Sequence, residues 1–217
     1  MKPTLRLVLL ALMGISVLAD EHPVGMPADK AMALLVEGNQ RYAAHRETHP
    51  DATLERRHEL VGSQHPYAVI VGCSDSRVPP ELLFDAGLGD LFVIREAGNF
   101  VDGVVLGSVE YAVEHLGVKL VLVLGHESCG AVTAAVNHTK EAHITTIVKA
   151  LQPALAESKG QPGDPVHNCV VANARLAAKQ IRESKPVLAR AVLHDGVKVQ
   201  AAVYDLETGK VNLLDQP

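Results

Sequence analysis

The sequence contains no tryptophan, three phenylalanines and four tyrosines, so aromatic residues make up only 3% of its 217 residues. It also lacks an excess of basic residues, because 20 lysines and arginines stand against 25 acidic residues and give a net charge of −5. Proteins that bind nucleic acids usually present a basic surface, and those that bind single strands add aromatic side chains for stacking. The composition therefore predicts no nucleic-acid partner.

The apolar run near the N-terminus is too short to span a membrane. It covers Leu7–Leu18, twelve residues, whereas a transmembrane helix needs about 20. Lys2 and Arg6 precede the run and the small residue Ala19 follows it, as in a secretory signal that is cleaved. We predict a signal peptide over residues 1–19, with an uncleaved anchor or a buried helix as the alternative.

Residues 20–217 are expected to form a single domain with one hydrophobic core, since their number is usual for one domain and no repeat or low-complexity segment interrupts them. The signal peptide predicts that this domain is exported, either to the periplasm or out of the cell. No cysteine directly follows the apolar run as a site for a lipid. We therefore expect no stable membrane anchor after cleavage.

Cysteine is scarce, with only Cys73, Cys129 and Cys169 in the whole chain. A disulfide framework in an exported protein would use a larger and even number. Cys169 lies in the apolar stretch "NCVVANA" without potential ligands nearby, so we expect it in the core. The other two cysteines lie near charged residues. For a thiol that meets oxidants, binding a metal is one protective role.

Short apolar runs rich in β-branched residues predict buried strands at 67–71 ("YAVIV"), 91–94 ("LFVI") and 119–126 ("KLVLVLGH"). Helical spacing predicts helices at 29–46, with Asp29 as the N-cap, and at 53–61, 104–116, 129–137, 144–155 and 170–181. The C-terminal tail predicts two strands joined at Thr208 and Gly209. This alternation indicates an α/β fold with a mostly parallel β-sheet flanked by helices.

Potential metal ligands follow two of the predicted strands. Cys73 follows the first strand after one glycine, His126 ends the third, and Cys129 lies three residues further on. The carboxyl ends of parallel strands meet at one edge of the sheet, and a helix or turn that starts near Cys129 would direct its side chain toward His126. Two thiolates and one imidazole suit zinc best among the common metals. The spacing therefore predicts a zinc site.

Two other interpretations of Cys73 stay open at this point. A nucleophilic cysteine in a phosphate-binding loop needs a longer series of free backbone N–H groups before its arginine. Here Arg77 follows after only four residues, and Pro79 and Pro80 lack N–H groups. Alternatively, Cys73 and Cys129 are small core residues, which leaves the charged residues around them without a common purpose.

Asp75 and Arg77 form the second half of the predicted site. An arginine can hold an aspartate in a bidentate contact and keep it ionised. Two residues past a zinc ligand, Asp75 could accept a hydrogen bond from water on the metal, or it could supply a fourth ligand. The plainer alternative is an Asp–Arg contact that only shapes the loop.

Two short motifs, one near the end of the first predicted strand and one near the end of the third, together form a highly specific sequence pattern. The segment "CSDSR" at 73–77, together with "GHESCGA" at 125–131, strongly resembles the β-class carbonic anhydrases. The similarity runs from about Asp29 to the C-terminus and includes "LLVEGNQRY", "REAGNFV" and "YDLETGKV".

The resemblance implies a role for each residue of the two motifs. Cys73, His126 and Cys129 match the family's ligands for one Zn²⁺ per subunit. Asp75 and Arg77 match its catalytic dyad, in which the aspartate can become a fourth zinc ligand in a closed state.

A substrate-binding pocket like that of the plant-type members is also implied. Phe92, Ala97 and Tyr111 match residues that line a narrow CO2 pocket in that type. Gln64 matches a glutamine that bonds substrate in the partner subunit's site. The resemblance thus implies a homodimer or a higher even oligomer, with N-terminal helices that extend onto a partner subunit.

Two positions depart from the family pattern. Glu96 stands where the family commonly has asparagine, and the added acid is expected to alter the rim of the pocket. Ile70 stands where some bacterial members have a tryptophan that belongs to an inhibitory bicarbonate site. We therefore do not expect that inhibitory site in this chain.

The implied function is the zinc-dependent, reversible hydration of CO2 to bicarbonate and a proton. One alternative is a related zinc hydrolase that acts on carbonyl sulfide or carbon disulfide. The other is a non-catalytic exported domain in which the zinc is structural.

Overall fold

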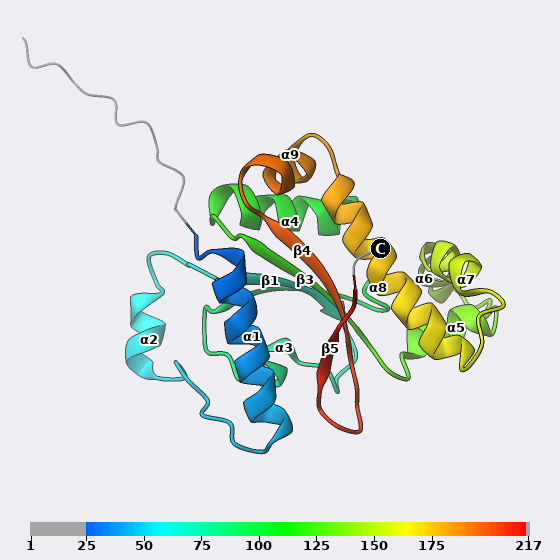
Figure 1. The fold of residues 1–217 in the computed structure, drawn as a ribbon, viewed down its shortest axis with the longest axis horizontal. Coiled ribbons are helices and arrows are strands. Elements are labelled where there is room, and N and C mark those ends of the chain that lie inside the picture. The colour runs from blue at the N-terminus through cyan, green and yellow to red at the C-terminus, as the bar shows by residue number, and fades with distance from the viewer. Residues whose placement is uncertain (1–24, 216–217) are drawn as a thin grey trace, which may run out of the picture.

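A central five-stranded sheet organises the chain, and the computed structural model describes residues 25–215 of it. The strand order is β2-β1-β3-β4-β5. Figure 1 labels β1, β3, β4 and β5. The strands are β1 (Ala68–Cys73), β2 (Leu91–Glu96), β3 (Leu120–His126), β4 (Lys198–Tyr204) and β5 (Val211–Leu213). All neighbours pair in parallel except β5, which runs antiparallel to β4. The prediction of an α/β fold with a mostly parallel sheet is confirmed.

The continuous apolar runs of β1 and β3 are explained by burial on both faces of the sheet. Every residue of these two strands is buried. Alternate side chains enter two different cores, so that Ile70 and Leu122 join one cluster while Val71 and Val123 join the other.

Helices cover both faces and supply the other side of each core. The longer ones are α1 (Ala28–Ala43), α4 (Gly103–His115), α8 (Pro165–Glu183) and α9 (Val187–His194). The shorter ones are α2 (Leu54–Glu59), α3 (Pro80–Leu83), α5 (Gly130–Val136), α6 (Ile144–Ala150) and α7 (Gln152–Ser158). Figure 1 shows α5, α6 and α7 grouped beside α8 at one end of the molecule.

Some predicted helices differ in detail from the observed ones. The apolar stripe at 144–155 is shared by two helices that meet at Leu151, because Pro153 lies in the first turn of α7 and lacks the N–H group that a continuing helix needs. The short α3 and the eight-residue α9 were not predicted.

The prediction that Asp29 caps α1 is wrong. The helix begins one residue earlier, after Pro27, and no side chain caps it. Asp29 instead lies in the first turn, where a carboxylate favours the positive end of the helix dipole. It also accepts a hydrogen bond from Lys198 Nζ at 2.6 Å, which ties α1 to the start of β4.

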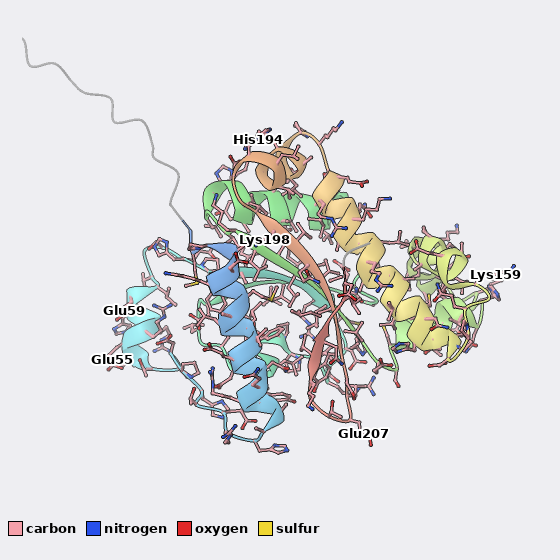
Figure 2. All side chains as sticks on the ribbon, viewed as in Figure 1. Glu55, Glu59, Lys159, His194, Lys198 and Glu207 are labelled. Carbon is pink, nitrogen blue, oxygen red and sulfur yellow. The ribbon has the colours of Figure 1, made fainter. Side chains whose placement is uncertain are left out.

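The N-terminal helices differ in how they pack. On α1, Ala31 and Leu35 are fully or almost fully buried against the chain's own sheet. No residue of α2 is buried, and Glu55 and Glu59 lie at the edge of the molecule in Figure 2. The extension of these helices onto a partner subunit stays a prediction.

The predicted signal peptide, residues 1–19, lies outside the described residues. Within residues 25–215, no helix has both the length and the apolar character needed to cross a membrane.

Candidate active site

Three potential metal ligands converge at the carboxyl edge of the sheet. Cys73 is the last residue of β1 and His126 the last of β3, and these strands are adjacent and parallel. Cys129 is the N-cap residue of α5, directly after the turn that follows β3. Their donor atoms all lie within 4.8 Å of one another, and all three residues are buried. The structure therefore brings together the three residues that the sequence predicts as ligands.

The geometry of this group suits a tetrahedral metal ion. The two sulfurs, Sγ of Cys73 and Sγ of Cys129, lie 3.9 Å apart. Two thiolates on one tetrahedral zinc, each about 2.3 Å from the ion, would lie about 3.8 Å apart. The Nδ1 atom of His126 bonds the carbonyl of Glu127 at 2.9 Å, while its buried Nε2 has no hydrogen-bond partner among the described residues. An imidazole held in this way presents a free lone pair to a metal.

The protons in the group point to the same conclusion. The hydrogen bond between the two thiols lowers the pKa of Cys73 and raises the pKa of Cys129. Burial opposes a charge on His126, but the negative charge of the neighbouring Cys73 keeps its pKa above the ordinary value. These directions favour a thiolate at Cys73 and protons on its two neighbours. A divalent metal replaces such protons when it binds.

Asp75 lies at the border of this group and is held by Arg77. Its Oδ1 accepts from the backbone N–H and the Nε of Arg77, both at 2.9 Å, and its Oδ2 accepts from Nη2 at 2.7 Å. These hydrogen bonds hold the pKa of Asp75 well below its usual range. Its Oδ2 lies 3.9 Å from Nε2 of His126. The carboxylate is therefore ionised and lies beside the three donors. Its short contacts are to Arg77, and it is not a member of the group of three.

Arg95 is a site residue that the sequence reasoning missed. On β2, it donates from Nε to the carbonyl of Cys73 at 2.8 Å and from Nη2 to the carbonyl of Asp75 at 2.6 Å. It can reach both because the register pairs it with Gly72, one residue before Cys73. The signal was present in the sequence, since Arg95 is a cation directly after the apolar run "LFVI".

The turn that follows β2 also contacts the metal group, that is, Cys73, His126 and Cys129 together. Asn99 donates its N–H to the carbonyl of Glu96 at 2.9 Å, which closes a four-residue turn. Gly98, at the third position, has a φ of +87°, as a type II turn requires. Its N–H donates to Sγ of Cys73 at 3.3 Å. Ala97 lies in this turn, so one predicted pocket residue is beside the metal group, and Glu96 pairs in register with Cys73.

The other predicted pocket residues lie elsewhere in the chain. Phe92 pairs in register with Val69, four residues before Cys73. This places it about 13 Å along the sheet from the metal edge, that is, the carboxyl edge at which Cys73 and His126 lie. Tyr111, on α4, has its ring 6.2 Å from that of Phe92 and is 47% exposed. Gln64 is exposed in the segment between α2 and β1. These three residues do not meet the metal group within one chain.

Cys169 is buried on α8 and is not a member of the metal group. This agrees with its predicted place in the core.

Comparison with known proteins bears directly on this site. Residues 68–211 match the family model described as carbonic anhydrase. A carbonic anhydrase of Mycolicibacterium smegmatis is 37% identical over 188 residues, which cover 84% of this chain and 91% of that protein. Carbonic anhydrase 2 of Mycobacterium tuberculosis is 55% identical over 105 residues, which cover 48% of this chain and 51% of that protein.

Solved structures show the same fold. The β-carbonic anhydrase CafA of Aspergillus fumigatus has a TM-score of 0.69 and 29% identity, and the match covers 86% of this chain and 91% of that one. One of two β-carbonic anhydrases from Sordaria macrospora, described as tetrameric, has a TM-score of 0.67 at 25% identity, over 86% of this chain and 97% of that one. Fold, sequence and the match over both motifs agree, and the chain belongs to the β-class carbonic anhydrase family.

Proposed function

We propose that this chain catalyses the zinc-dependent, reversible hydration of CO2 to bicarbonate and a proton. The observation that carries the proposal is the buried group of Cys73, His126 and Cys129, with the ionised Asp75 at its border. Zinc held there would supply a water with its pKa lowered from 15.7 to about 7, and so a hydroxide at neutral pH.

Each residue of the site then has a definite task. Cys73 and Cys129 hold the metal as thiolates, and the carbonyl of Glu127 orients His126 so that Nε2 faces the same point. Asp75 accepts a hydrogen bond from the reacting water and orients it toward CO2. A carboxylate held this firmly by Arg77 is a poor proton store, so the released proton leaves by another group.

A structural zinc site accounts less well for the same geometry. Closed structural sites normally use four protein ligands, whereas three donors converge here among residues 25–215. The nearest carboxylate, that of Asp75, makes its short contacts to Arg77 instead. An open fourth position beside an ionised carboxylate favours catalysis.

We further propose that a second copy of the chain completes the substrate pocket. Phe92 and Tyr111 lie together, yet far from the metal group of their own chain, on an edge strand and on α4. Gln64 is exposed and free to serve another subunit. The working form is therefore a homodimer or a higher even oligomer. The Sordaria macrospora relative is described as a tetramer, which supports this proposal.

Export through the predicted signal peptide is also proposed, with the periplasm or the exterior as the destination. N-terminal sequencing of the mature protein and fractionation of expressing cells test it. Cleavage before Asp20 is the expected result, and an intact N-terminus in the cytoplasm would contradict the proposal.

Stopped-flow measurement of CO2 hydration tests the function directly. The chain beginning at Asp20 is assayed as purified, after treatment with a zinc chelator, and after zinc is restored. We expect activity to disappear and return with the metal. A zinc-loaded protein that leaves CO2 hydration at the uncatalysed rate would overturn the proposal, and carbonyl sulfide and carbon disulfide would then be assayed as substrates.

A further inference from the structure

A polar residue interrupts the buried face of α8. Asn173 is only 5% exposed, and the buried residues on the same helix include Val170, Ala174 and Ala177. An amide in such surroundings costs free energy unless its groups are hydrogen-bonded. The partner of Asn173 therefore shows what the residue is for.

That partner is the turn beside the metal group. Nδ2 of Asn173 donates to the carbonyl of Gly98 at 2.8 Å, across 75 positions of sequence. The N–H of the same glycine donates to Sγ of Cys73 at 3.3 Å. One residue thus separates the amide of Asn173 from the sulfur of a proposed metal ligand.

Gly98 needs an external contact to hold this orientation. Its φ of +87° suits glycine, and a Cβ there would come within 3.0 Å of Ala131 Cβ and 3.2 Å of Leu151 Cδ1. The position therefore requires glycine, whose backbone is the most flexible of all residues, so another contact must fix its orientation. The turn is closed on one side by the bond from Asn99 to Glu96, and Asn173 holds the carbonyl of Gly98 on the other side.

We propose that Asn173 is a positioning residue of the metal centre: by holding the carbonyl of Gly98, it keeps the N–H of Gly98 on the Cys73 sulfur. This inference rests on the proposed function, since it requires a metal at Cys73. A hydrogen bond to a ligating sulfur withdraws negative charge from it and fixes its direction. Loss of such an outer contact commonly costs about 10- to 100-fold in metal affinity or activity.

The competing explanation is that Asn173 only joins α8 to the turn. In that case its removal would lower the stability of the metal-free and the metal-loaded protein by the same amount. If Asn173 has a positioning role, its removal also reduces the difference in stability between the metal-loaded and the metal-free protein, because metal binding itself becomes weaker.

The chain offers a matched control on the same helix. Gln180 also donates a side-chain amide to a backbone carbonyl, from Nε2 to Val101 at 3.2 Å, but it is exposed and does not contact Gly98. Asn173→Leu and Gln180→Leu therefore each remove one bond from α8 to the segment after β2. Asn173→Ser is the second test variant, because its hydroxyl is shorter and the substitution keeps a polar group in case leucine prevents folding.

The first readout is the rate at which zinc-loaded protein releases Zn²⁺ to a chromogenic chelator. We expect release to be about 10- to 100-fold faster in both Asn173 variants than in the wild type and in Gln180→Leu. The second readout is the absorption of the Co²⁺-substituted proteins, whose sulfur-to-cobalt charge-transfer band should move to longer wavelength in the Asn173 variants only. The third is thermal unfolding with and without Zn²⁺.

Unchanged release rates and an unchanged cobalt spectrum would overturn the inference, as would equal losses of stability with and without metal. If the wild type binds neither Zn²⁺ nor Co²⁺, the proposed function itself fails. The two failures are therefore distinguished by the wild type alone.

Discussion

The metal edge of the sheet and the region of β2 and α4 differ in how completely one chain builds them. At the metal edge, all three donors are buried and close, and neighbours hold the main chain and side chains around them. Around β2 and α4, Phe92 and Tyr111 contact each other, but Tyr111 is 47% exposed and neither reaches the metal group.

The reason lies in strand order. β1 and β3 lie next to each other inside the sheet, so the residues at their carboxyl ends meet within one chain. β2 is an edge strand, and all six of its residues are only partly buried. The comparison teaches that the group of three donors is complete within a single chain, whereas the proposed substrate pocket depends on what covers the edge.

The strongest test of the metal edge is Cys129→Ala, because it removes one of the three donors that converge there. We expect loss of bound zinc and of all CO2 hydration above the uncatalysed rate, measured by metal analysis and stopped flow. Cys169→Ala is the matched control, since Cys169 is also a buried free cysteine but lies outside the group. Zinc retained by Cys129→Ala would contradict the assignment.

Asp75→Asn should separate metal binding from catalysis at the same edge. The variant keeps the size of the side chain but loses the charge that Arg77 stabilises. We expect full zinc content and a loss of kcat/KM of about 10²- to 10³-fold, the scale seen when one preorganised hydrogen bond at a reacting group is removed. Wild-type turnover in this variant would refute the role given to Asp75.

Mixed subunits test whether the β2 and α4 region serves another chain. Asp75→Asn and Tyr111→Ala subunits are coexpressed with different tags, and the mixed dimer is purified. If Tyr111 acts in the partner's site, one site of the mixed dimer is fully wild type and activity rises toward half that of the native dimer. If Tyr111 acts in its own chain, neither site is intact and no recovery is seen.

Asp85→Asn should change stability while leaving both regions active. The Asp85 side chain is fully buried and accepts from Nε of Arg41 at 2.6 Å and from the N–H groups of Thr48 and His49. Arg41 is 35% exposed, so the pair is buried only on the aspartate side, and losing the charged acceptor costs about 1–3 kcal/mol of unfolding free energy. Urea unfolding at neutral pH measures the loss, and zinc content and turnover per folded molecule should be unchanged.

The same carboxylate predicts how stability depends on pH. Burial alone would raise the pKa of Asp85, but the hydrogen bonds from Arg41, Thr48 and His49 outweigh it and lower the pKa below its usual range. Its contribution is therefore complete above the unfolded value of about 3.9 and is lost as the pH falls below it. The gap in stability between wild type and Asp85→Asn should narrow in acid, and a constant gap would argue against this assignment.

The fold was predictable where burial and periodicity agree. The apolar runs of β1 and β3 are continuous because these strands are buried on both faces, and β2 is a similar run beside them. The apolar stripe predicted at 170–181 matches the buried side of α8. Local signals failed where a helix is very short, as in α3, or where a proline divides an apolar stripe, as between α6 and α7.

The sequence by itself determined which residues form the group of three potential metal donors. Cys73 and His126 stand at the ends of continuous apolar runs, which predict buried parallel strands. The carboxyl ends of such strands meet at a common edge, so two positions far apart along the chain are expected to meet. Asp75 and Arg77 are only two residues apart, so the local chain is enough to bring their side chains into contact beside Cys73.

Only the tertiary structure decided what surrounds those donors. The register of β2 against β1 places Arg95 on two carbonyls of the ligand loop and leaves Phe92 far from the metal edge. The packing of α8 brings Asn173 to Gly98. Register and helix packing arise from the fit of whole elements, and a shift of one residue in either would change these contacts without changing the local pattern that sequence reasoning reads.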